Sequence, residues 1–169
     1  VDLLPENYLK AYHGKWHLGD EIIPQHGFDH WVSMEDHYRL FFTKKEYLSH
    51  FSDYYHFLAE RGFEPDSENM GERVFSRHME ASMEEELTKA SFLGDQAAQY
   101  IRENRDQPFA LCVSYLEPHP PHTGPLTELY DPLSLSTGPT FMEKPGANVP
   151  LIIRLMAAAS AKWPLPNAV

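Results

Sequence analysis

Cysteine and basic residues are both scarce in this sequence. The only cysteine is Cys112, so no disulfide can form within the chain, and the redox compartment stays open. The 14 lysines and arginines are outnumbered by 25 acidic residues, which gives a formal net charge of −11. Nucleic-acid binding needs a basic surface that displaces counterions, so we expect no nucleic-acid partner.

Long apolar runs are missing as well. No stretch approaches the roughly 18 apolar residues of a membrane span, so no membrane association is expected. A signal peptide has a basic segment followed by an apolar segment, and the first residues of this sequence contain neither, so no signal peptide is expected. The chain also lacks an initiator methionine, and we expect it to be a piece of a longer protein. These features leave the localisation open.

The remaining composition is typical of a folded domain. Hydrophobic residues make up 42% and aromatic residues 13% of the 169 residues. A chain of this length corresponds to one domain, and this composition is sufficient to bury a core. We therefore expect a single domain over residues 1–169.

The segment 14–19, Gly-Lys-Trp-His-Leu-Gly, places an ammonium group and an imidazole two residues apart. If this segment is extended, Lys15 and His17 project to the same side. Trp16 and Leu18 would then anchor it in the core. A cation beside a proton-transfer group suits an enzyme that handles a small oxyanion. The alternative is an ordinary turn in which both side chains are merely solvated or hydrogen-bonded.

Hydrophobic spacing and the positions of Gly and Pro predict the elements of the first 104 residues. These are a short helix over 3–12, a strand over 27–32, a helix over 44–61, a polar loop over 64–74 and a helix over 83–104, with Ser91 as a candidate N-cap. We expect the segment 130–146 to wrap the surface. The segment 151–161 is expected to form a helix with Leu155 and Met156 inward.

An almost uninterrupted apolar run covers residues 109–115. Such runs are typical of strands buried on both faces of a parallel sheet. A helix followed by a buried strand is half of a βαβ unit, which favours an α/β fold. Cys112 lies inside this run and is interpreted as a small, inert core residue.

A proline-rich loop, 116–125, follows this strand and contains His119 and His122. In open α/β sheets the ligand crevice lies beyond the carboxyl ends of the strands. Proline restricts the loop, which suits a positioned catalytic group. The alternative is a surface loop with incidental histidines.

Two histidine pairs have the spacing of metal ligands on a helix. His13 and His17 are four residues apart, as are His26 and His30. Glycine and proline around both pairs disfavour a helix, so no metal site is predicted there.

Taken together, these motifs resemble the type I sulfatase family. They are the Gly-Lys-Trp-His-Leu-Gly of 14–19, the Gly-Phe-Asp of 27–29, the strand of 108–114 and the Glu-Pro-His-Pro-Pro of 117–121. The likeness runs from about residue 4 to residue 166. It implies a partial alkaline-phosphatase-like α/β/α sandwich with a mostly parallel central sheet.

The resemblance also implies the hydrolysis of a small-molecule or carbohydrate sulfate ester. In this family a formylglycine attacks sulfur, and a divalent cation, usually Ca²⁺, binds it and the sulfate. Lys15 would neutralise charge near the sulfate, and His17 would take a proton from the formylglycine hydroxyl. His119 would contact the sulfate or the ester oxygen and assist the leaving group. His122 matches no functional position.

The sequence departs from the family in several places. It has no Cys-x-Pro-x-Arg motif, no N-terminal Asp-Asp pair and no later Asp-His-Gly or Asp-Asn segment to complete the metal site. The strand that precedes the family's Gly-Lys-Trp-His-Leu-Gly is also expected to be absent, since Tyr12 and His13 run straight into Gly14. We therefore expect an incomplete sulfatase domain that is inactive alone, either an internal portion or a degenerate relative with a deletion at Tyr12-His13.

Two other functions stay open. One is a phosphatase or phosphonate hydrolase of the same superfamily, and the other is a non-catalytic module that binds sulfated ligands. The sequence leaves the particular ester and the oligomeric state open. A partial sheet would leave open edges and uncovered apolar faces, so either aggregation or reliance on missing segments is expected.

Overall fold

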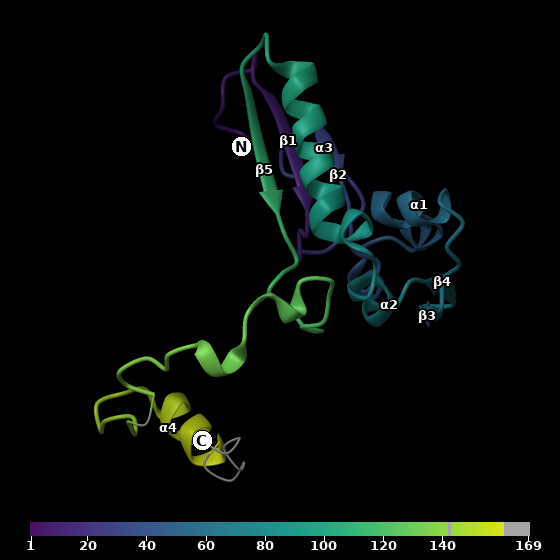
Figure 1. Ribbon diagram of the computed structural model, residues 1–169. Coiled ribbons are helices and arrows are strands. Elements are labelled where there is room, and N and C mark those ends of the chain that lie inside the picture. Colours follow the sequence, from purple (N-terminus) through teal and green to yellow (C-terminus); the bar gives the residue numbers. More distant parts are fainter. Residues whose placement is uncertain (142, 161–169) are drawn as a thin grey trace. The chain divides into compact units, whose positions relative to one another are not determined.

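The computed structural model describes residues 1–141 and 143–160. It divides into two compact units, Val1–Leu129 and Tyr130–Val169. The first unit is a mixed α/β structure built on a parallel sheet of three strands (Figure 1). The predicted α/β class is thus confirmed.

The sheet has the strand order β2-β1-β5, so β1 is central and the other two form its edges. The strands are β1 (Leu9–Gly14), β2 (His30–Val32) and β5 (Phe109–Ser114). Both neighbours run parallel to β1. The predicted strand over 109–115 is confirmed to residue 114, and the predicted strand over 27–32 is confirmed for its last three residues.

The predicted helix over 3–12 is wrong, because its second half is the central strand β1. The backbone N–H and C=O groups of this segment pair with β2 on one side and β5 on the other. Such pairing in the folded chain outweighs the helix-like spacing of the local apolar residues. A strand therefore does precede Gly14. The hypothesis of a deletion at Tyr12-His13 loses its basis.

Helix α3 (Lys89–Asn104) lies along β1 and β5 on one face of the sheet (Figure 1). Its buried side chains include Phe92, Leu93 and Tyr100, so most of the predicted helix over 83–104 is confirmed. The N-cap is Thr88 rather than Ser91, because the Thr88 side chain accepts from the Ser91 N–H. The preceding turn is a separate 3-10 helix, η3 (Glu85–Leu87).

The buried imidazole of His13 and the exposed imidazole of His30 lie close together beside α3. His13 Nε2 is 3.2 Å from His30 Nδ1, and the Tyr100 ring packs against both. Burial, and then the neighbouring His30, lower the pKa of His13 to about 4. His13 is consequently neutral inside the fold near pH 7.

Aromatic residues gather on the other face of the sheet. The Tyr12 ring stacks on Trp31 at 4.8 Å and meets Trp16 edge-on at 5.0 Å. Trp16 thus anchors its segment as predicted, whereas Leu18 is 74% exposed and does not.

The edge strand β5 is only half-buried, and Cys112 is exposed. The predictions of a strand buried on both faces and of a core cysteine are therefore wrong. The apolar run could not show that β5 is an edge strand, because the residues of a strand do not reveal whether a further strand pairs with it.

The predicted helix over 44–61 is divided into the 3-10 helix η2 (Lys45–Ser49) and α1 (Asp53–Ala59). Ser52 begins α1, because its side chain accepts a hydrogen bond from the Tyr55 N–H. Tyr54 and Leu58 enter the core cluster with Phe92 of α3. Another 3-10 turn, η1 (Arg39–Phe41), precedes this region.

The predicted loop over 64–74 contains an antiparallel hairpin. Its strands are β3 (Ser67–Asn69) and β4 (Glu72–Val74). The two turn residues, Met70 and Gly71, have φ values of 53° and 85°, which match a tight hairpin turn. Helix α2 (Arg77–Ala81) follows and is capped by Ser76.

The first unit ends with the 3-10 turn η4 (Thr127–Leu129). The second unit contains η5 (Pro132–Ser134) and α4 (Leu151–Ser160), and the described residues of 130–146 are exposed as predicted. Helix α4 confirms the predicted helix to residue 160, but Leu155 and Met156 are 56% and 59% exposed rather than inward. Residue 161 lies outside the described residues. In the ranges 1–141 and 143–160, no helix is long and apolar enough to cross a membrane.

Candidate functional site

The two segments with predicted site residues begin at adjacent strand ends. Gly14 of β1 pairs with Ser114 of β5, and the next N–H, that of Lys15, donates to the Ser114 carbonyl at 2.9 Å. Because the strands are parallel, both following segments leave the same carboxyl edge of the sheet. This is the edge at which the sequence predicted a ligand site.

Lys15 and His17 both contact Tyr38. The Lys15 ammonium donates to the Tyr38 hydroxyl at 3.2 Å, and the His17 ring meets the Tyr38 ring edge-on with centroids 4.5 Å apart. The segment is not extended, since His17 has a φ of 61°. The two predicted side chains are nevertheless brought together, on a residue that the sequence did not single out.

The backbone of this segment is held by Glu21. Its buried carboxylate accepts from the N–H groups of Trp16 at 2.9 Å and His17 at 2.5 Å. Burial raises the pKa of Glu21, and the two N–H donors partly oppose that rise. The Tyr12 hydroxyl holds the same segment by donating to the Lys15 carbonyl at 2.5 Å.

His17 and Tyr38 line a small cavity of about 440 Å³ together with Glu21 and Phe41. A larger cavity of about 650 Å³ lies along the loop 115–127, and His119 and His122 line it. Its charged lining residues are Arg77, Glu80, Glu85, Lys89 and Glu117.

His119 is fixed by its own loop. Its Nδ1 lies 2.7 Å from the Pro120 carbonyl oxygen. A carbonyl only accepts, so Nδ1 carries the proton and Nε2 is free of this bond. Within the described ranges no hydrogen bond or ion pair joins His119 to Lys15 or His17.

Arg77 lies beside both parts of the candidate site, Tyr38 and the cavity that His119 lines. Its guanidinium is 5.3 Å from the Tyr38 ring centroid, and the residue also lines the cavity that holds His119. Its Nε is buried and has no hydrogen-bond partner among the residues that the structure describes. No motif or spacing in the sequence points to this residue.

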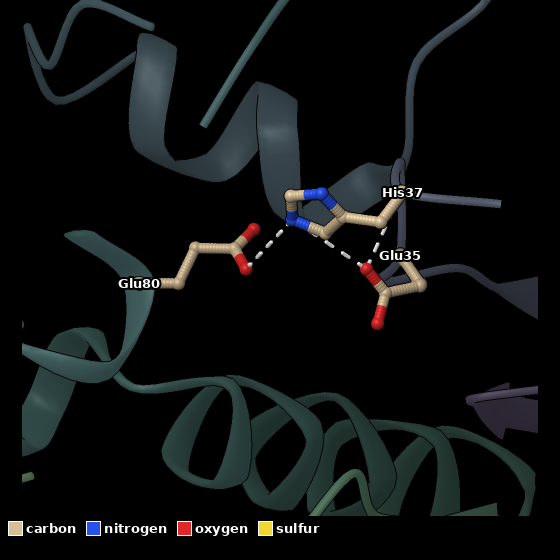
Figure 2. Close-up of side chains that lie close together, drawn as sticks. All are labelled: Glu35, His37 and Glu80. Atoms are coloured by element: carbon tan, nitrogen blue, oxygen red, sulfur yellow. Dashed lines mark hydrogen bonds and ion pairs between the residues drawn. The ribbon is translucent and has the colours of Figure 1, made fainter. Parts of the chain in front are cut away.

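Glu35, His37 and Glu80 form a group that offers metal-ligand atoms (Figure 2). His37 Nε2 lies 3.7 Å from Glu35 Oε1 and 3.4 Å from Glu80 Oε2. The ligand atoms of the three side chains lie within 4.8 Å of one another. This spacing is compatible with a metal ion.

Two basic side chains already neutralise this group. The buried Lys89 ammonium lies 2.7 Å from Glu80 Oε2 and 3.7 Å from Glu35 Oε1, and Arg77 lies 3.6 Å from Glu35 Oε2. Burial alone would raise the pKa of Glu35, but Lys89 and the other cations outweigh it and the pKa is lowered. Burial likewise opposes the charge of Lys89, yet the two glutamates raise its pKa.

Lys89 therefore contacts the same two carboxylate oxygens that a metal ion would need. The Ca²⁺ expected from the resemblance does not fit this group either, since calcium prefers oxygen ligands and His37 offers nitrogen. In the described part of the chain, no other group of three potential ligands lies this close together. The cluster is best described as a buried ion-pair network.

Comparisons of the chain with protein-family models, with curated proteins and with solved structures gave no match. Functional inference consequently rests on the motifs and on the geometry of their residues.

Proposed function

We propose that this chain is part of a sulfatase catalytic domain of the alkaline-phosphatase-like superfamily. In this proposal it supplies the Lys and His groups that bind a sulfate ester. One observation carries the proposal: β1 and β5 are adjacent parallel strands, and both matching motifs follow their carboxyl ends. A strand before Gly14 also agrees with the family pattern. The three-stranded sheet would be a portion of the larger α/β/α sandwich.

Each predicted residue has a physical role in this proposal. Lys15 supplies a fixed positive charge for the sulfate oxygens, because lysine is protonated at neutral pH. His17 places an imidazole beside that charge, and an imidazole can act as a general base. His119 presents Nε2, since its Nδ1 is bonded to the Pro120 carbonyl, and a protonated ring could donate to the ester oxygen.

The nucleophile is not part of this sequence, which has no Cys-x-Pro-x-Arg motif. No step is assigned to calcium, because the ligand group among the described residues does not fit it. The proposed function of the chain itself is thus the binding of the sulfate group without turnover. The missing motif also keeps a non-catalytic, sulfate-binding relative as the second candidate.

Titration with 4-nitrophenyl sulfate, followed by calorimetry and by absorbance, tests this proposal. We expect saturable binding, weakened at least about 10-fold by Lys15→Met, because a charge-assisted contact contributes about 1.5–3 kcal/mol. Lys45→Met is the matched control, since Lys45 is exposed on η2. We expect no release of nitrophenol, with or without Ca²⁺.

Three results would count against this proposal. Absence of binding, or binding that is equal in Lys15→Met, contradicts the sulfate role. Turnover that is lost in His17→Gln contradicts the expected inactivity. His78→Gln is the control for this variant and should keep such turnover, because His78 is exposed on α2. Much stronger binding of 4-nitrophenyl phosphate favours the phosphatase alternative.

A further inference from the structure

Tyr38 is the residue on which the basic groups of the candidate site converge. Its hydroxyl accepts from Lys15, its ring meets the edge of His17, and the Arg77 guanidinium lies over the same ring. These contacts join Tyr38 to two other segments of the chain, that of Lys15 and His17 and that of Arg77. A single aromatic side chain thus determines where three potential anion-binding groups lie.

The contact with Lys15 restricts an otherwise flexible side chain. The Lys15 ammonium is 3.2 Å from the Tyr38 hydroxyl and 5.0 Å from the ring centroid. A free lysine loses up to about 2 kcal/mol of side-chain entropy when it is ordered on binding. Ordering it in advance therefore favours ligand binding.

Tyr38 itself lies on a well-anchored segment. The next residue, Arg39, is buried and donates to the backbone carbonyls of Leu48 and His50. The preceding residue, His37, belongs to the buried ion-pair network. Arg77 is held by Glu35 of that network at 3.6 Å. The ion-pair network therefore helps to fix the candidate site. His37 of the network precedes Tyr38 in the chain, and Glu35 holds Arg77 over the Tyr38 ring.

We propose that Tyr38 is a positioning residue for the proposed sulfate-binding function, holding Lys15 and His17 in place for the anion. This inference rests on the proposed function. The hydroxyl acts on Lys15 and the ring acts on His17. Phe at this position would keep the ring contact and lose the hydrogen bond, whereas Leu would lose both.

The ring contact is tested first, without ligand, by the ¹H–¹³C NMR signals of the histidine rings. The His17 signal is assigned by its absence from His17→Gln. We expect the Tyr38 ring current to shift this signal, so that Tyr38→Leu moves it and Tyr38→Phe leaves it nearly in place. A His17 signal that is unchanged in Tyr38→Leu overturns the proposal.

The hydroxyl contact is tested by titrating inorganic sulfate into the whole chain. We expect Tyr38→Phe to weaken sulfate binding about 5-fold and Tyr38→Leu at least about 10-fold. Tyr47→Phe is the matched control, because Lys44 also lies over the Tyr47 ring, at 5.2 Å, outside the site. The amide spectra of all three variants verify that the fold is retained, and Tyr38→Phe keeps the test decisive if Tyr38→Leu does not fold.

The outcomes separate the two proposals. If the unsubstituted chain binds sulfate and both Tyr38 variants bind it equally well, the role of Tyr38 is wrong and the proposed function stands. If the unsubstituted chain does not bind sulfate, the proposed function fails, and the positioning role fails with it.

Discussion

The N–H of Lys15 donates to the carbonyl oxygen of Ser114, one residue beyond the last β1–β5 pair. This bond joins the two segments that carry the predicted site residues. It requires close approach of two backbones at Gly14, whose φ is 112°.

Gly14→Ala is expected to destabilise the fold by about 3 kcal/mol or more. A Cβ at this position would lie 2.0 Å from the Ser114 carbonyl oxygen, so the two strands would have to separate. Gly62→Ala is the control, because Gly62 has a φ of 86° but no described residue lies within 4 Å of the place that an alanine Cβ would occupy. It should cost only about 1 kcal/mol. Urea denaturation measures both, and equal losses would show that backbone strain alone matters.

Glu21→Gln is expected to loosen the segment that carries Lys15 and His17. The amide NH₂ of glutamine cannot accept a hydrogen bond, so either Trp16 or His17 loses the partner of its N–H. Hydrogen exchange of these two amides should become at least about 10-fold faster. Glu64→Gln changes an exposed side chain and should leave both rates unchanged. Unchanged exchange in Glu21→Gln would contradict the role given to this carboxylate.

The buried His13 predicts that the fold loses stability in mild acid. Its pKa is lowered from 6.5 to about 4, so the unfolded chain binds this proton more readily than the folded one. The loss therefore starts as the pH falls below about 6.5 and is complete near pH 4, at roughly 3 kcal/mol. The free energy of unfolding between pH 7 and pH 4 measures it. His13→Leu should have a flatter profile than the unsubstituted chain, and an equally steep profile would contradict this source of acid sensitivity.

Lys89→Met should both destabilise the fold and create affinity for a divalent transition metal. Removing the ammonium takes the closest ion-pair partner from Glu80 and leaves Glu35 with Arg77, and breaking such a buried ion pair typically costs about 3–5 kcal/mol. A metal ion held by Glu35, His37 and Glu80 would replace the missing charge. We expect Zn²⁺ to raise the unfolding midpoint of Lys89→Met and not that of the unsubstituted chain or of Lys44→Met, which removes an exposed pair. A rise of equal size in the unsubstituted chain would show that Lys89 does not exclude the metal.

The sequence predicted those parts of the fold whose signals are local. The apolar spacing of Phe92 and Tyr100 identified α3, and the run before Ser114 identified β5. The central strand β1 was missed, because its pairing partners lie far away in the sequence and its own residues alternate weakly. The hairpin around Met70 and Gly71 was missed because a polar sequence concealed a tight turn.

Within the candidate site, the sequence predicted Lys15, His17 and His119 from their motifs. It could not identify Glu21 or Tyr38, since nothing near these residues in sequence shows what they contact. Lys89 could not be identified either, because its position in the helix is typical of an exposed residue, whereas the structure buries it. Residues that position others depend on tertiary contacts, and a single sequence does not display these.

The exposed Cys112 provides a simple means of observing this fold in solution. It is the only thiol of the chain, so a maleimide dye would attach at one known place without any cysteine being removed first. Cys112 pairs with Tyr12 in the sheet register, and Tyr12 stacks on Trp31. Excitation of tryptophan would therefore transfer energy to the dye while β5 stays paired with β1. Loss of that transfer would report the separation of the two strands on which the candidate site depends.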